Sequence, residues 1–212
     1  MLFMQLLQRQ VQYNRRAAVE YAYRHWNDPN PEFANFDTFG AGGDCSNFTS
    51  QCLLAGGWPM DYRRNTYDAS WWYRRIGDDP FDEDANDWWS CSWALANVQF
   101  LYMQANGGEV LNLSRTPSLA RRLRIGDIVY YDWDGDGIFT HSAIVTSRSS
   151  SGIPRVTYRT LAPTRPMRNT DYRLRFRGRS TRIYAIRIAS EPMVYGVAPN
   201  WNRLRPCDST RG

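Results

Sequence analysis

The stretch that decides the fold is residues 43–57, GDCSNFTSQCLLAGG, in which a glycine-rich turn leads into a helix that a glycine pair ends. Asp44 stands where a helix cap is expected. Phe48 and Cys52 follow Cys45 at intervals of three and seven residues, which places all three on one helical face. We therefore expect Cys45 in the first turn of a helix, at the rim of the core.

Helical patterns fill the first half of the chain and short β-rich runs fill the second. The expected helices cover 5–26, 44–55 and 92–104, and the expected strands cover 128–131, 140–146, 155–160 and 183–188. This order predicts an α+β fold, with N-terminal helices packed on a C-terminal antiparallel sheet. We expect one domain over 5–190 and a loosely ordered tail over 191–212. The Trp-rich stretch 58–91 is expected to be an irregular loop.

Charge is distributed unevenly, and every basic residue is Arg. Residues 148–212 carry 14 Arg against three acids, a net charge of +11, whereas residues 1–147 carry −6. The basic segment 148–212 can contact a polyanion such as a wall polymer, or its Arg side chains can simply be solvated on outward strand faces. No run is long and apolar enough for a membrane span, and the apolar start lacks the features of a signal peptide. We expect a monomer.

Cys45 is the candidate nucleophile. Unpaired backbone amides and the helix dipole at a helix N-terminus stabilise a thiolate. The same amides, around Asp44 and Ser46, can bind the oxyanion of a tetrahedral intermediate. The alternative is that Cys45 is a small buried hydrophobe.

His141 is the candidate general base. A thiol nucleophile needs a base within hydrogen-bond reach, and the chain has two histidines. His25 lies within the first expected helix, in a context typical of a surface or packing residue. His141 begins an expected strand directly after a hairpin, where an imidazole can project toward a helix N-terminus.

The sequence resembles the putative amidase domain family of bacteria, a branch of the papain-like group that includes the CHAP and NlpC/P60 wall hydrolases. The resemblance covers most of residues 13–190. The matching blocks are 13–18 (YNRRAA), 43–53 (GDCSNFTSQCL), 55–60 (AGGWPM), 71–73 (WWY), 92–93 (SW), 126–129 (GDIV), 132–137 (DWDGDG) and 141–145 (HSAIV).

The resemblance implies a papain-like fold in which Cys45 attacks an amide carbonyl and His141 takes the thiol proton, then donates it to the leaving amine. The usual substrate is an amide or peptide bond in peptidoglycan, which implies an extracellular or wall-associated protein. The family normally supplies a third polar residue on the next strand, where this chain has Arg159-Thr160. Thr160, a backbone carbonyl, Asn169 or Asp171 remain as candidates to orient His141.

Asp132, Asp134 and Asp136, with a glycine at the sixth position, resemble the start of a calcium loop. The twelfth position, where a bidentate Glu belongs, is Ala143. A tight polar hairpin explains the same residues, and we favour it. We expect no required cofactor, with calcium as the alternative.

The sequence leaves two features undecided: the role of four tryptophans and the pairing of three cysteines. The aromatic residues Trp71, Trp72, Trp88 and Trp89 can stack on a glycan or peptide, or pack within their loop. Disulfides can join Cys52, Cys91 and Cys207 in pairs, but nothing requires them.

The leading hypothesis is a cysteine-dependent peptidoglycan amidase. A second is a wall- or polyanion-binding module with decayed catalytic residues, motivated by the missing third polar residue. A third is a protease or deamidase effector that acts on proteins.

Overall fold

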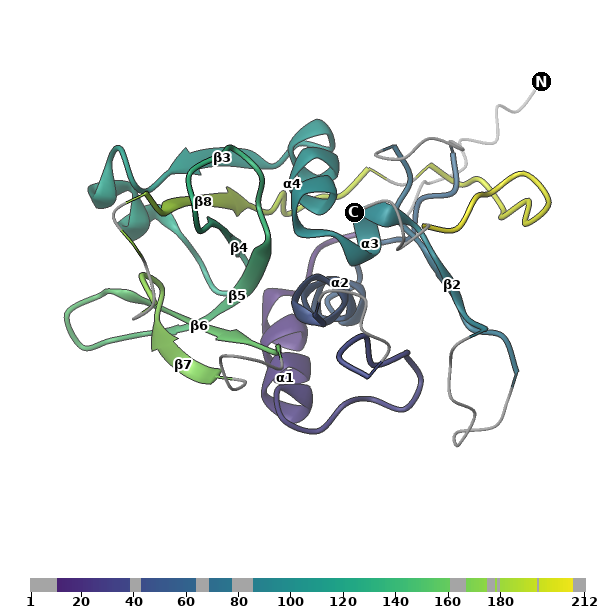
Figure 1. Ribbon diagram of the computed structural model, residues 1–212, viewed down its shortest axis with the longest axis horizontal. Coiled ribbons are helices and arrows are strands. Elements are labelled where there is room, and N and C mark those ends of the chain that lie inside the picture. Colours follow the sequence, from purple (N-terminus) through teal and green to yellow (C-terminus); the bar gives the residue numbers. More distant parts are fainter. Residues whose placement is uncertain are drawn as a thin grey trace, which may run out of the picture.

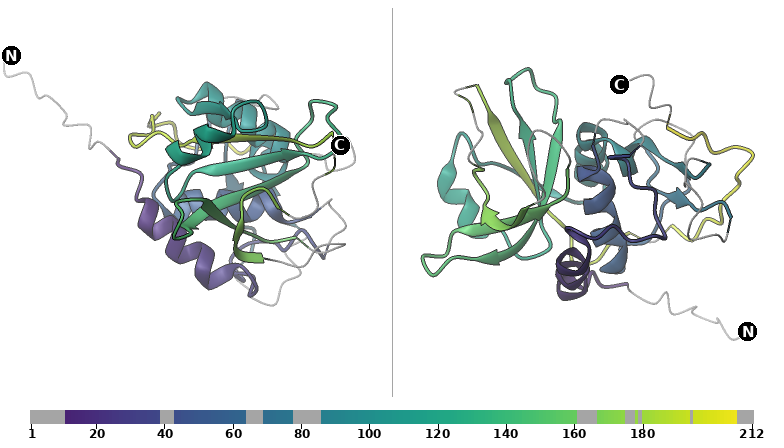
Figure 2. Two further views of the ribbon diagram at one scale, coloured as in Figure 1. Left: turned by 90° about the vertical axis from the view of Figure 1, so that its left-hand side faces the viewer. Right: turned by 60° about the horizontal axis from the view of Figure 1, so that its bottom comes forward.

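The computed structural model describes residues 11–38, 43–63, 69–77, 86–160, 167–174, 178, 180–193 and 195–207. A group of helices and the main sheet, which has six strands, stand side by side (Figures 1 and 2). The helices are α1 (Arg15–His25), α2 (Cys45–Ala55), α3 (Cys91–Ala94), α4 (Ala96–Ala105) and the 3-10 helix η1 (Pro117–Arg122). The strands are β1 (Tyr73–Arg74), β2 (Trp88–Trp89), β3 (Glu109–Asn112), β4 (Ile128–Asp132), β5 (His141–Arg148), β6 (Pro154–Tyr158), β7 (Met167–Asp171) and β8 (Arg182–Arg187). The predicted α+β class, with N-terminal helices on a C-terminal antiparallel sheet, is confirmed.

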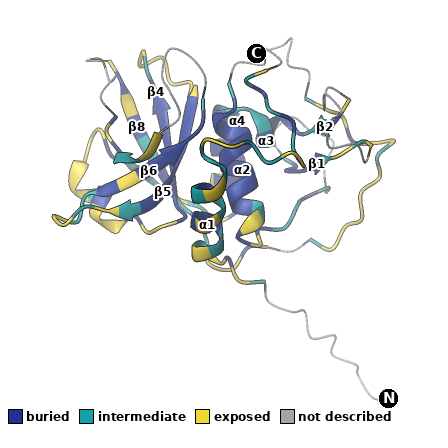
Figure 3. Cartoon of the chain, turned by 90° about the horizontal axis from the view of Figure 1, so that it is seen from below, coloured by how far each residue is buried: buried dark blue, intermediate teal, exposed yellow. Residues whose placement is uncertain are grey.

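The main sheet has the strand order β3-β8-β4-β5-β6-β7, and every neighbouring pair is antiparallel. Strands β4 and β5, which are adjacent along the chain, lie in its centre and are buried along nearly their whole length (Figure 3). β5 begins at His141, so this residue lies at one end of a central strand.

The first expected helix, over 5–26, begins later than predicted. Residues 1–10 lie outside the described part, and α1 begins at Arg15 because Asn14 caps it: the Asn14 side chain accepts a hydrogen bond from the backbone N–H of Ala17. The expected helix over 92–104 is divided, because Leu95 is extended (φ −107°, ψ 127°) between α3 and α4.

Four strands were not predicted. β1 and β2 form a two-stranded sheet within the stretch expected to be irregular. β3 and β7 are the outer strands of the main sheet, and β7 is only partly buried, with polar residues on both faces. Such strands lack the alternation of apolar and polar residues that signals a half-buried strand.

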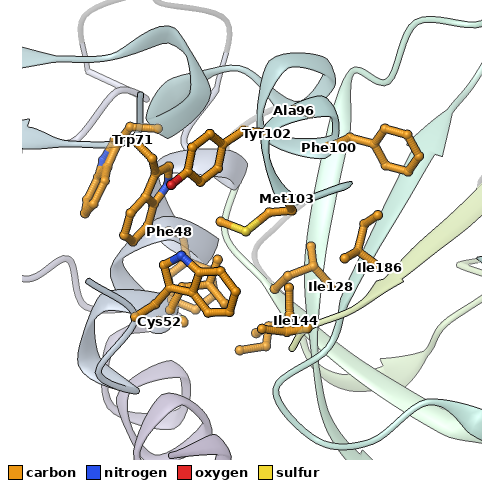
Figure 4. Packing of buried hydrophobic residues seen from close by; sticks show 14 of the residues in the cluster. Phe48, Cys52, Trp71, Ala96, Phe100, Tyr102, Met103, Ile128, Ile144 and Ile186 are labelled. Atoms are coloured by element: carbon orange, nitrogen blue, oxygen red, sulfur yellow. The ribbon is translucent and has the colours of Figure 1, made fainter. Parts of the chain in front are cut away.

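The hydrophobic core lies on both faces of the sheet. On the helical face, Phe48 and Cys52 of α2 pack in one cluster with Ile128, Ile144 and Ile186 of the sheet (Figure 4). The second cluster covers the opposite face and includes Val129, Tyr131, Ala143, Val145 and Tyr158. The alternation along β4 and β5 explains this division, because successive side chains of a strand point to opposite faces.

The C-terminal residues 195–207 run over the helical half of the molecule. Trp201 packs against Tyr62 and Trp72, with ring centroids 5.6 and 5.7 Å apart, and Cys207 forms a disulfide with Cys91. The domain boundary at residue 190 stays a prediction, but these residues contribute to the packing. Among the described helices, none combines the length and the hydrophobicity required to cross a bilayer.

Candidate active site

The turn before the candidate nucleophile requires glycine. Gly43 has φ +112°, a region that side chains with a Cβ rarely adopt. A Cβ at this position would lie 3.2 Å from Oγ1 of Thr160, which follows the end of β6. The turn therefore passes close to the sheet and delivers Cys45 to the first position of α2.

The sulfur of Cys45 lies against the beginning of β5. Its Sγ is 4.0 Å from the carbonyl oxygen of Thr140 and 3.8 Å from the hydroxyl of Ser46, and 6% of the residue is exposed. Burial raises the pKa of the Cys45 thiol, while the backbone N–H of Ser142 and the Ser46 hydroxyl act in the opposite direction. Thr140 and Ser142 flank His141, so the sulfur lies beside the strand segment that carries the histidine.

The imidazole of His141 lies among aromatic rings. Tyr158 meets it edge-on at a centroid distance of 4.7 Å, and Tyr131 and Trp133 lie at 5.5 and 5.8 Å. Tyr131 and Tyr158 belong to the second cluster, so His141 points to the face opposite Ser142. Its Nε2 is buried without a hydrogen-bond partner, and burial lowers the pKa of His141 to about 3.

Cys45 and His141 are not hydrogen-bonded to each other, although both are among the described residues. Both groups are neutral at pH 7, because burial raises the thiol pKa and lowers the imidazole pKa. The expectation that sulfur and imidazole meet directly stays a prediction.

Asp44 occupies the N-cap position of α2, but its side chain forms no capping bond, contrary to expectation. Its carboxylate instead accepts from both Nε and Nη2 of Arg159, in an ion pair that is 0% and 3% exposed. The other oxygen accepts from the backbone N–H of Phe36 and the amide of Asn47, at 3.1 and 2.7 Å. Arg159 also donates to the carbonyl of His25. This pair joins the end of α1, the start of α2 and the end of β6 at the residue that precedes Cys45.

The structure distinguishes among the residues that were candidates to orient His141. The register Ile144↔Thr157, continued along the strands, places Thr160 opposite His141. Asn169 lies elsewhere, because its Oδ1 accepts from Thr146, Ser147 and Tyr23, near the other end of β5. Asn169 is therefore wrong as an orienting residue.

Asp171 is also wrong for that role. It forms a partly exposed ion pair with Arg173 at 2.5 Å, and in the ladder it pairs with Arg155 near the start of β6. Thr160 stays a prediction.

Two of the four tryptophans that were candidates for stacking on substrate cannot form a stacking surface. Trp71 and Trp72 are 0% exposed, and their indoles donate to the hydroxyls of Ser50 and Ser70. These two predictions are wrong: the rings are core residues. Trp88 and Trp89 are half-buried in β2, so a role in substrate binding stays a prediction for them.

Whether the acidic hairpin binds calcium stays a prediction. Asp132, Asp134 and Asp136 each offer an oxygen, and these atoms lie within 4.8 Å of one another. Both oxygens of Asp132, however, accept turn amides, from Gly135 at 2.7 Å and Gly137 at 3.0 Å. Ala143 lies buried in β5 and has no ligand atom to add in its side chain. The hydrogen bonds explain the hairpin without an ion.

Sequence reasoning missed two sets of residues near Cys45. One is Arg159, which in the sequence is only a departure from the family pattern, because no local signal indicates its partner Asp44, 115 positions away. The hydroxyls of Ser46 and Ser142 lie 3.2 Å apart, and Gln99 of α4 lies close to them. Only the α2 sequence, with its run of small polar residues, hinted at this contact.

Comparison with known proteins places the chain in a family. A protein of Bacillus subtilis (strain 168), named "Uncharacterized protein YhbB", is 36% identical over 152 residues, which is 72% of this chain and 43% of that protein. A second from the same organism, "Uncharacterized protein YjcM", is 26% identical over 145 residues, 65% of this chain and 29% of that protein. The chain thus spans less than half the length of these relatives. No solved structure gives a significant match. The family described as "Putative amidase domain" matches residues 12–185, and the chain belongs to this family.

Proposed function

We propose that this protein is a papain-like, cysteine-dependent amide hydrolase in which Cys45 is the nucleophile and His141 the general base. The family itself indicates an amidase-type hydrolase. The observation that carries the cysteine mechanism is the position of Cys45 Sγ, in the first turn of α2 and 4.0 Å from the carbonyl of Thr140, the residue before His141.

The proposed reaction has two stages. His141 takes the thiol proton, and the sulfur of Cys45 forms a bond to the amide carbon while the negative charge moves to the carbonyl oxygen. The backbone N–H groups at the start of α2, including that of Ser46, face this oxygen and stabilise it. The C–N bond then breaks, the amine leaves with the proton from His141, and water hydrolyses the thioester.

In the resting structure the His141 imidazole and the Cys45 sulfur are not hydrogen-bonded, so the proposed mechanism requires substrate binding to bring them together. The unpartnered Nε2 of His141 is free to accept a proton, whereas its lowered pKa makes it a weak base in the buried state. Contact between imidazole and sulfur, and a rise in the imidazole pKa beside a forming thiolate, would accompany substrate binding. Catalytic hydrogen bonds often tighten only in the substrate complex.

We propose an amide or peptide bond of bacterial peptidoglycan as the substrate and the wall or extracellular space as the location. The disulfide between Cys91 and Cys207 supports a compartment outside the reducing cytoplasm.

The test is digestion of purified peptidoglycan followed by mass spectrometry of the new termini. Cys45→Ala and His141→Ala should abolish product, whereas Cys52→Ala, at the other free and buried cysteine, should retain it. If Cys45→Ala releases the same fragments as the parent, the cysteine mechanism is wrong. If a protein substrate is cut and peptidoglycan is not, the substrate assignment is wrong.

A second function, polyanion binding, is favoured by a groove of about 720 Å³ at the far end of the sheet. Its lining includes the exposed Arg155 and Arg173 and the hydroxyl residues Ser149 and Ser151, with Asp171 as its acid. We propose that this groove holds an anionic wall polymer. The double substitution Arg155→Gln with Arg173→Gln should weaken wall binding and its salt dependence, and unchanged binding would exclude the groove.

A further inference from the structure

A continuous chain of hydroxyl groups runs from the sulfur of Cys45 into the core. The Ser46 hydroxyl lies 3.8 Å from Sγ, the Ser142 hydroxyl lies 3.2 Å from that of Ser46, and Oγ1 of Thr49 lies 3.1 Å from that of Ser142. Thr49 reaches Oε1 of Gln99 at 3.1 Å. Ser46, Thr49, Ser142 and Gln99 are all 0% exposed.

Gln99 fixes one end of this chain. Its amide nitrogen donates to the carbonyl of Ser46 at 3.1 Å and to the hydroxyl of Ser50 at 2.7 Å. Its oxygen accepts from the hydroxyl of Tyr130 at 3.0 Å, so its partners determine which way the amide points. At this end, Gln99 therefore presents an acceptor to Thr49.

The protons of the chain can be arranged in two orders. A hydroxyl donates one hydrogen bond and accepts up to two. With a neutral thiol, Cys45 donates to the carbonyl of Thr140 or to Ser46. Ser46 then donates to Ser142, Ser142 to Thr49, and Thr49 to Gln99. With a thiolate, rotation of the three hydroxyls reverses the order, so that Thr49 donates to Ser142, Ser142 to Ser46, and Ser46 to the sulfur. Gln99 keeps the hydrogen bond from Tyr130 in both cases, so its oxygen is never left unpaired.

We propose that the Ser46–Ser142–Thr49 hydroxyl chain, anchored by Gln99, reorients when Cys45 ionises and stabilises the thiolate. The inference rests on the proposed function for its purpose, because only a nucleophilic Cys45 needs a thiolate. No bond is made or broken within the chain: the thiol proton leaves to His141, and the hydroxyls only rotate. The hydroxyls of Ser46 and Ser142 both interact with the reacting sulfur, whereas Thr49 is a positioning residue.

The charged and titratable groups around Cys45 explain why such a chain is needed. Asp44, next to it in the chain, raises the thiol pKa, and Arg159 from the end of β6 is engaged by Asp44. His141 of β5 is neutral, and burial raises the pKa of Tyr130 of β4. Among the described residues, the groups that favour the thiolate are therefore hydroxyls and the backbone N–H of Ser142.

The test is the pH dependence of Cys45 alkylation by iodoacetamide, followed by peptide mass spectrometry so that Cys52 is counted separately. Thr49→Val removes the distal hydroxyl with almost no change of shape, and Thr49→Ser restores it. Ser46→Ala removes a hydroxyl that interacts with the sulfur. The matched control is Thr157→Val, at another buried threonine, whose hydroxyl pairs with that of Thr146 at 2.7 Å and not with this chain.

Removing a hydrogen bond to a charged group should slow alkylation of Ser46→Ala at pH 7 roughly tenfold, equivalent to about one pKa unit. Thr49→Val, which acts through two other hydroxyls, should slow it about threefold. Thr49→Ser and Thr157→Val should match the parent.

An alkylation profile of Thr49→Val identical to that of the parent would overturn the proposed role of the hydroxyl chain. An equal slowing of alkylation in Thr157→Val would overturn it as well. The readout is the thiolate itself, so it is separate from the test of the proposed function. If the protein hydrolyses no substrate but these shifts in alkylation appear, the proposed hydrolase function is refuted and the role of the hydroxyl chain is retained.

Discussion

Replacing Arg159 with methionine should strongly destabilise the fold. The substitution keeps an unbranched apolar stem but removes the guanidinium group that pairs with the Asp44 carboxylate, which is 0% exposed. Asp44 would keep only the hydrogen bonds from Phe36 and Asn47. Removing one member of a buried ion pair costs about 3–5 kcal/mol, because a charge remains buried without compensation. For a chain of this size the melting temperature should fall by roughly 6–20 °C.

The assay is urea denaturation followed by tryptophan fluorescence, for the parent, Arg159→Met, Asp44→Asn and the double variant. The double variant should recover at least half of the loss of Arg159→Met, because it leaves no buried charge unpaired. A loss below about 1 kcal/mol in Arg159→Met, typical of an exposed pair, would refute the reasoning.

The loss of unfolding free energy in Arg159→Met should depend on pH. Burial raises the pKa of Asp44 above its usual value, although Arg159 lowers it, so removing Arg159 must raise it further. An acid whose pKa is higher in the folded than in the unfolded state destabilises the fold above its unfolded pKa and ceases to do so below it. The deficit of Arg159→Met should therefore be largest near pH 7 and shrink toward pH 4. A constant deficit would mean that Asp44 is not the unpaired group.

Three further predictions concern other parts of the molecule. Burial lowers the pKa of His141 to about 3, so below pH 6.5 the unfolded state binds a proton that the folded state does not. The free energy of unfolding should therefore fall on acidification by roughly 1.4 kcal/mol per pH unit. His141→Gln should flatten this slope in acid denaturation. Reduction of the Cys91–Cys207 disulfide, or replacement of both residues by serine, should cost about 2–5 kcal/mol in chemical denaturation. Trp71→Ala should cost about 3–5 kcal/mol, whereas Trp88→Ala should leave the melting temperature nearly unchanged and lower turnover on walls; the reverse result would mean that Trp71 is not a core residue.

The sequence by itself determined the α+β class, the helix that begins at Cys45 and the central strands β4 and β5. These features are local: a glycine turn, the periodicity of apolar residues and the hairpin between the two strands are all encoded within short segments. Membership of the amidase family could be anticipated for the same reason, because the Cys and His blocks are contiguous.

Only the tertiary structure decided which residues surround Cys45. Arg159 reaches Asp44 across 115 positions, and Ser142 reaches Ser46 across 96. No local pattern encodes such contacts, because they depend on how α2 packs against β5 and on where β6 ends. For the same reason the sequence left open whether Trp71 and Trp72 bind substrate or pack within their loop. Packing of distant segments, rather than local preference, buried them.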